Sequence, residues 1–166
     1  MEATDTTEKG FESLIVNWLV NHNGYEQGHS HDFNTEYALD TTRLFRFLKN
    51  TQPDAVKKLQ LETNPQKTAQ FLARVRDEIT KRGIVDVLRR GIKAYPASLI
   101  MFYMTPSVNN PAAAALYAKN IFSVTRQLHF SPDATKLSLD LCIFVNGLPQ
   151  RCGVSLLNTR QVVHGC

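Results

Sequence analysis

Residues 137–145 alternate between large aliphatic side chains and other residues, and an Asn-Gly pair follows directly. The aliphatic set is Leu137, Leu139, Leu141, Ile143 and Val145, and the intervening set is Ser138, Asp140, Cys142 and Phe144. Such alternation is typical of a β-strand with one buried face. Asn146-Gly147 is the pair that most favours a two-residue type I′ turn. The sequence therefore predicts a β-hairpin whose second strand follows Pro149.

The first half of the chain is dominated by helix signals. Apolar residues recur at helical spacing before Gly24, at Phe11, Leu14, Ile15, Trp18 and Leu19. They predict a first helix with an apolar stripe. Further helices are expected from Asp40 or Thr41, from Pro53, from Pro65 to Gly83, from Ile84 to near Gly91, and over 112–119. Residues 25–34 are expected to form a loop.

Two more strands are predicted in the second half. Residues 98–104 (SLIMFYM) are an apolar run bounded by prolines, which is typical of a strand covered on both faces. Residues 122–130 alternate well enough for a strand that projects Arg126. A chain of 166 residues has the length of one domain. We therefore expect a single α/β domain over 1–166, with a mixed sheet flanked by helices.

The charge is distributed unevenly along the chain. Residues 1–40 carry eight acidic residues and one basic residue, Lys9, which gives a net charge of −7. Because the whole chain has a net charge of +4, residues 41–166 carry +11. A basic body favours an anionic partner such as nucleic acid. A solvated surface of mixed charge is the alternative.

Cysteine usage and the acidic N-terminus bear on the compartment. The three cysteines have no CxxC spacing, so neither a disulfide framework nor a zinc site is expected. The first ten residues are polar, unlike a signal peptide, and the longest charge-free run, 94–118, is broken by prolines. We expect a cytoplasmic protein without a membrane span.

Asp140 is the candidate for chemistry within the predicted hairpin. It lies between Leu139 and Leu141, and an ionised carboxylate buried in a strand requires a cation, a hydrogen-bond donor or a metal. A carboxylate at the strand edge, facing solvent, is the alternative. No acidic residue follows Asp140 in the sequence.

Five segments, in one order, resemble the N-terminal nuclease region of the R subunit of type I restriction-modification enzymes. They are FESLIVNWLVNHNGY (11–25), DFNTEYALDTTRLFRFL (32–48), RRGIKAY (89–95), NPAAAALYAKNIFSVTRQLHFSPD (110–133) and LSLDLCIFVNGLP (137–149). The resemblance implies a restriction-endonuclease-like fold of the PD-(D/E)xK type. It also implies Mg²⁺-dependent cleavage of double-stranded DNA. In full-length members it further implies ATP-driven translocation, with methyltransferase and specificity subunits as partners.

The resemblance also assigns roles to four residues. Asp140 becomes the first metal ligand and Glu12 a helix carboxylate at the same catalytic site, while Arg126 and Gln127 lie near that site on a strand that faces DNA. Glu12 could instead be a solvated helix residue. Arg126 could pair with an acid such as Asp133, and Gln127 could be a polar residue at a strand edge.

The sequence departs from the family after the predicted turn. The pattern expects Glu and Lys on the returning strand, where this chain has Val154 and Leu156, and residues 150–166 form an atypical tail. The ATPase motor motifs are also missing from the sequence. We expect a frame change or truncation, or else a paralogue that kept the fold without the chemistry.

Weak or absent Mg²⁺ binding and incomplete nuclease activity follow from this departure. The alternatives to a nuclease are a DNA-binding module without catalysis and a fragment that docks on the methyltransferase subunits.

Overall fold

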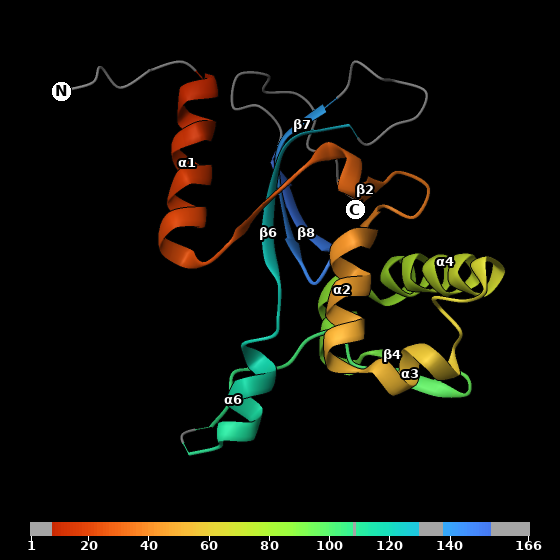
Figure 1. Cartoon of the computed structure of the whole chain (residues 1–166). Coiled ribbons are helices and arrows are strands. Elements are labelled where there is room, and N and C mark those ends of the chain that lie inside the picture. Colours follow the sequence, from red (N-terminus) through yellow and green to blue (C-terminus); the bar gives the residue numbers. More distant parts are fainter. Residues whose placement is uncertain (1–7, 108, 130–137, 154–166) are drawn as a thin grey trace.

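The structure is a computed structural model that describes residues 8–107, 109–129 and 138–153. Its centre is a four-stranded sheet with helix α1 on one side and α2 on the other (Figure 1). The elements, in chain order, are α1 (Glu8–Asn23), β1 (Glu26–Gly28), the 3₁₀ helix η1 (Ser30–Asp32), β2 (Phe33–Asn34), β3 (Leu39–Asp40), α2 (Thr41–Thr51), α3 (Pro53–Lys58), α4 (Pro65–Arg82), α5 (Ile84–Arg90), β4 (Ile92–Ala94), β5 (Ala97–Leu99), α6 (Pro111–Tyr117), β6 (Phe122–His129), β7 (Ser138–Val145) and β8 (Leu148–Gly153).

The main sheet has the strand order β1-β6-β7-β8. Strand β1 runs parallel to β6, and the two other pairs are antiparallel. The predicted α/β class, with a mixed sheet flanked by helices, is confirmed. The loop expected over 25–34 is wrong in part, because Glu26–Gly28 forms β1. This strand has three residues and no aliphatic side chain, so only its pairing with β6 reveals it.

The predicted hairpin forms, and its turn is buried. Asn146 and Gly147 have φ values of 51° and 82°, as the turn requires. The Asn146 amide group donates to the Met101 carbonyl oxygen at 2.9 Å, and its oxygen accepts from the Ile121 N–H at 2.7 Å. The Gly147 carbonyl oxygen accepts from the Asp40 N–H at 2.9 Å. The turn therefore connects the sheet to the helical half of the chain.

The helix boundaries follow the predicted capping residues. Asp40 accepts from the Arg43 N–H at the start of α2, and Asn64 accepts from two backbone N–H groups at the start of α4. Gly83 ends α4 at φ 79°. Prolines occupy the first turn of three helices, at Pro53, Pro65 and Pro111.

The strand predicted over 98–104 is wrong beyond Leu99. Only Ala97–Leu99 forms a strand, and it pairs with β4 rather than with the main sheet. The backbone beyond it bonds to side-chain amides: Gln52 both donates to and accepts from Ile100 at 2.8 Å. Asn120 does the same for Tyr103, at 2.8 and 3.1 Å. The amides take the bonds that a neighbouring strand would provide.

The apolar stripe predicted for α1 faces the protein only in part, because Ile15 and Leu19 are partly buried. Glu12 and Val16 are buried, with exposed fractions of 6% and 3%. Phe11, Leu14 and Trp18 are instead 54%, 56% and 48% exposed. The inward face of α1 therefore combines apolar residues with Glu12, which meets polar groups of the sheet.

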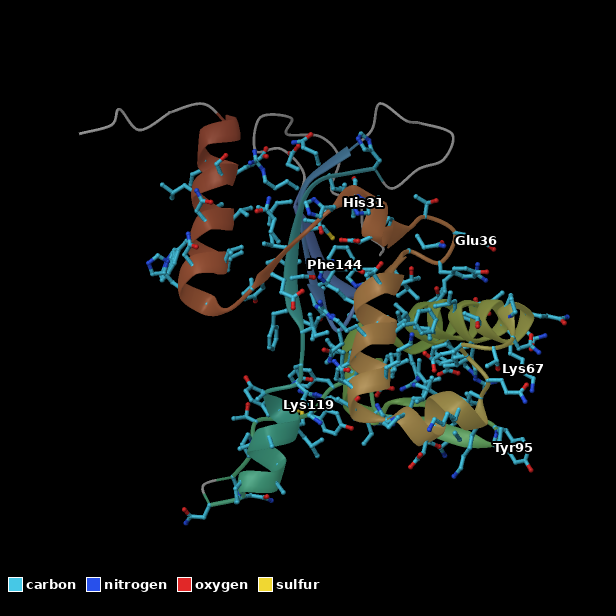
Figure 2. All side chains as sticks on the ribbon, viewed as in Figure 1. His31, Glu36, Lys67, Tyr95, Lys119 and Phe144 are labelled. Carbon is cyan, nitrogen blue, oxygen red and sulfur yellow. The ribbon has the colours of Figure 1, made fainter. Side chains whose placement is uncertain are left out.

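The main hydrophobic core lies in the helical half. Its buried residues include Leu44, Phe47 and Leu48 of α2, Phe71, Leu72 and Val75 of α4, and Leu148 of β8. Tyr95, 98% exposed, points away from this core between β4 and β5 (Figure 2). A smaller cluster on the sheet contains Leu128, Cys142 and Phe144.

Cys142 contradicts the expectation of a chain without disulfides. It is fully buried and disulfide-bonded. In the register of β7 and β8, the backbone position opposite it is that of Cys152. The spacing of the cysteines in the sequence carries no signal of this bond.

No helix in the described part of the chain is long and apolar enough to cross a membrane.

Candidate functional site

Glu12 is a buried carboxylate on α1 that faces β6. Its Oε2 atom accepts from Arg126 Nη2 at 3.4 Å and from Gln127 Nε2 at 3.4 Å. A carboxylate removed from water is costly unless charge or hydrogen bonds compensate it. Arg126 and Gln127 supply that compensation. The alternative of a solvated helix residue is therefore wrong for Glu12, and its role as a metal ligand stays a prediction.

The backbone of Gln127 explains why both side chains reach one carboxylate. Consecutive residues of a regular strand point to opposite faces of the sheet. Gln127 has φ 49°, in the left-handed region that non-glycine residues seldom adopt. This conformation interrupts the alternation within β6. Arg126 and Gln127 therefore both contact Glu12, although they are neighbours in the sequence.

Asp140 lies in β7 at the same level of the sheet. The register pairs Arg126 with Leu141 and Leu128 with Leu139, so the position opposite Asp140 is that of Gln127. Asp140 is partly buried. Three elements thus bring the four predicted residues to one region. Contacts join Glu12, Arg126 and Gln127, and the strand register adds Asp140.

Arg126 forms an ion pair, as the alternative predicted, but with a different acid from the one expected. Arg126 pairs with Glu12, and Asp133 lies outside the described residues. The Arg126 side chain is 30% exposed. Within the described ranges, its Nε is one of two buried side-chain polar atoms without a hydrogen-bond partner. Val154 and Leu156, which stand where Glu and Lys are expected, also lie outside the described residues.

A second polar cluster, not predicted from the sequence, surrounds Arg43 of α2. Arg43 is buried, and its Nη1 donates to Asp40 at 2.7 Å and to Asp32 at 2.8 Å. Its Nε donates to Glu26 at 3.3 Å and its Nη2 to the Gln27 carbonyl oxygen at 3.2 Å. The cluster joins α2 to β1 and η1. The sequence feature that could have indicated this cluster is an acid and a base three residues apart at the start of a helix, Asp40 and Arg43.

Burial and hydrogen bonding set the ionisation of this cluster. Burial raises the pKa of Asp40 above its ordinary value, despite the bonds from Arg43. For Asp32, burial also acts to raise the pKa, but hydrogen bonds from Arg43 and from the His29 backbone outweigh it, and the pKa is lowered. The two carboxylates raise the pKa of Arg43, although its burial opposes this. Arg43 is therefore the cation on which both carboxylates depend.

The described residues contain no group of three His, Cys, Asp or Glu side chains that could hold a metal. The predicted set of Glu12 and Asp140 would provide two carboxylates. Mg²⁺ in proteins is commonly held by one or two carboxylates together with water. Both contacts to Glu12 use Oε2. The donor chemistry therefore fits Mg²⁺, with fewer protein ligands than a complete nuclease site has.

Comparison with known proteins gives one match. The sequence model of the family described as type I restriction enzyme R protein N terminus matches residues 5–150. No curated protein and no solved structure matches the chain.

Proposed function

The chain belongs to the family of the type I restriction enzyme R protein N terminus, and we propose that it binds duplex DNA at an incomplete nuclease site. The site comprises Glu12, Arg126, Gln127 and Asp140. In this proposal Arg126 and Gln127 face the DNA, and Glu12 and Asp140 border the position of a magnesium ion.

The convergence of Arg126 and Gln127 on Glu12 is the observation that carries the proposal. A surface ion pair needs no such arrangement, because ordinary strand alternation would not turn two consecutive residues of β6 toward Glu12. Here a strained residue brings two donors to a buried carboxylate. Strained backbone is concentrated at functional sites, where the surrounding structure maintains it. The neighbouring acid Asp140 is consistent with the same assignment.

Glu12 and Asp140 would hold Mg²⁺, and when bound the ion would activate water and stabilise charge on the phosphate. Arg126 provides a cation whose side chain is partly exposed and can meet a phosphate oxygen. Gln127 orients Glu12 through its amide. With Val154 and Leu156 in place of Glu and Lys, the chain lacks a second strand carboxylate and the amine that helps orient or deprotonate water.

The expected activity is therefore binding with little cleavage. Placement of the metal and water contributes much of the stabilisation that such a site can offer. Cleavage should be slower than in an intact site by orders of magnitude. A nicking assay with Mg²⁺ or Mn²⁺ tests this, with Asp140→Asn as the blank. Nicking at the rate of an intact nuclease, abolished by Asp140→Asn, would contradict the proposed loss.

Binding is tested by fluorescence anisotropy with a labelled duplex at several salt concentrations. The affinity of the wild type should fall steeply as salt rises, because phosphate contacts release counterions. Arg126→Ala should weaken binding and lower the salt slope by about one. Arg74→Ala is the matched control, since Arg74 is exposed on α4, outside the candidate site. Absence of duplex binding by the wild type would refute the proposal.

A docking role is the second candidate, favoured by the exposed apolar face of α1. Phe11, Leu14 and Trp18 are each about half exposed on this helix. Exposed apolar patches often mark protein interfaces. In this reading the chain binds the methyltransferase and specificity subunits without binding DNA. Co-purification with those subunits that Leu14→Asp abolishes, together with no duplex affinity, would favour docking over DNA binding.

A further inference from the structure

Strand β6 continues beyond the end of its partner β1. The two strands pair only from Ser123 to Thr125, and β1 ends at Gly28. Beyond Thr125, no strand in the described part of the chain pairs with β6 on that edge. Backbone groups at a strand edge bond to side chains or to water where no neighbouring strand supplies the partner.

The hydroxyl of Ser30 in η1 takes the place of the missing strand. Ser30 Oγ donates to the Gln127 carbonyl oxygen at 3.0 Å and accepts, at 3.5 Å, from the His129 N–H. Gln127 is the residue with φ 49°. The Ser30 side chain therefore bonds to the backbone of Gln127 and to that of the residue two positions later.

The 3₁₀ helix that carries Ser30 is anchored through Asp32. Within η1, Asp32 Oδ2 accepts from the His29 N–H at 3.0 Å. The same oxygen accepts from Arg43 Nη1 at 2.8 Å. The ion cluster around Arg43 thus anchors η1 to α2. This explains why three residues of 3₁₀ helix can hold the edge of a strand.

We infer that Ser30 is a positioning residue: its hydroxyl holds Gln127 in the left-handed conformation and so allows Arg126 and Gln127 to share Glu12. The inference deepens the proposed function. The expected effect of Ser30 on DNA binding rests on that function, whereas its effect on the conformation of Gln127 does not. Without the hydroxyl, Gln127 should relax to an extended conformation. Arg126 and Gln127 would then point to opposite faces of the sheet, and one of the two contacts with Glu12 would be lost.

The direct test measures the conformation of Gln127 by NMR in the full chain. The three-bond coupling between its amide and α protons is lower for a left-handed residue than for an extended strand. In Ser30→Ala this coupling should rise to the strand value, while that of Val124 stays unchanged. Ser30→Thr keeps the hydroxyl and should keep the low coupling. Ser98→Ala, at an exposed serine of β5, is the matched control.

Duplex affinity supplies the second readout. Ser30→Ala should bind several-fold more weakly than the wild type, and Ser30→Thr should restore binding. A coupling of Gln127 that stays low in Ser30→Ala would overturn the inference, whatever the DNA result. If the wild type bound no duplex, the proposed function would fail, and the coupling would still decide the role of Ser30.

A double variant covers the case in which Ser30→Ala does not fold. Glycine adopts positive φ without strain, so Gln127→Gly should remove the need for the hydroxyl. If Ser30→Ala is unfolded, adding Gln127→Gly should restore a cooperative urea transition. If Ser30→Ala folds, it should shift the urea midpoint less in the Gln127→Gly background than in the wild type. An equal shift in both backgrounds, or a double variant that remains unfolded, would overturn the inference.

Discussion

The guanidinium of Arg43 lies 2.7 Å from the carboxylate of Asp40, which is fully buried. The two residues are three positions apart at the start of α2, where Asp40 also accepts from the Arg43 N–H at 3.0 Å. Arg43 continues to Asp32 in η1 and to the backbone of β1. This residue pair therefore links the helical half of the protein to the edge of the sheet that supports the candidate site.

Arg43→Met should lower the free energy of unfolding by about 3–5 kcal/mol, because it leaves buried carboxylates without their cation. Urea denaturation measures this change. Arg74→Met is the control, at an exposed arginine of α4, and should change stability by no more than about 0.5 kcal/mol. Equal effects of the two substitutions would show that the buried cluster does not stabilise the fold.

Asp32→Asn should alter the acid sensitivity of the protein. Burial acts to raise the pKa of Asp32, but bonds from Arg43 and the His29 backbone prevail, so the folded pKa lies below the unfolded one. Its contribution to stability is then present above the unfolded carboxyl pKa and is lost as the pH falls through the folded pKa. The stability advantage of the wild type over Asp32→Asn should shrink over this acid range. A stability difference that does not vary with pH would contradict the lowered pKa of Asp32.

Gly147→Ala should be far more damaging than Gly24→Ala. Both glycines have positive φ, at 82° and 68°. A Cβ at Gly147 would lie against the Asp40 carbonyl oxygen and 2.7 Å from the Leu44 nitrogen, whereas one at Gly24 would meet nothing within 4 Å. Gly24→Ala should cost about 1 kcal/mol from backbone strain alone. Gly147→Ala should cost on the order of 3 kcal/mol or more, because backbone must move. Thermal denaturation of the two variants provides the comparison.

Val16→Ala should destabilise the protein more than Leu14→Ala, although leucine is the larger residue. Val16 is buried on α1, and its truncation should cost about 2 kcal/mol. Leu14 is 56% exposed, and its loss should change stability by about 0.5 kcal/mol or less. The reverse order in urea denaturation would mean that α1 buries the apolar stripe predicted from the sequence.

Local features of the fold could be predicted from the sequence because their causes are local. The Asn146-Gly147 turn needs two residues that tolerate positive φ. The starts of α2 and α4 need a side-chain acceptor followed by free backbone N–H groups, which Asp40 and Asn64 supply. The order of the family segments was also visible in the sequence, and the family match agrees with it.

Contacts between distant segments were decided by the tertiary structure alone. The apolar stripe of α1 did not predict the burial of Glu12, because Glu12 meets polar groups of β6 that lie more than a hundred residues away. The prediction that Glu12, Arg126 and Gln127 are neighbours came from the family resemblance. No periodicity in the sequence predicts their contact. The left-handed Gln127 and the support from Ser30 depend on β1 ending early beside β6.

The sequence by itself therefore determined the helices, the hairpin and the family, since capping, turn formation and hydrophobic periodicity act over a few residues. Only the tertiary structure decided which carboxylates are buried and which cations meet them. The cost of removing a charge from water depends on groups that the fold brings from elsewhere in the chain.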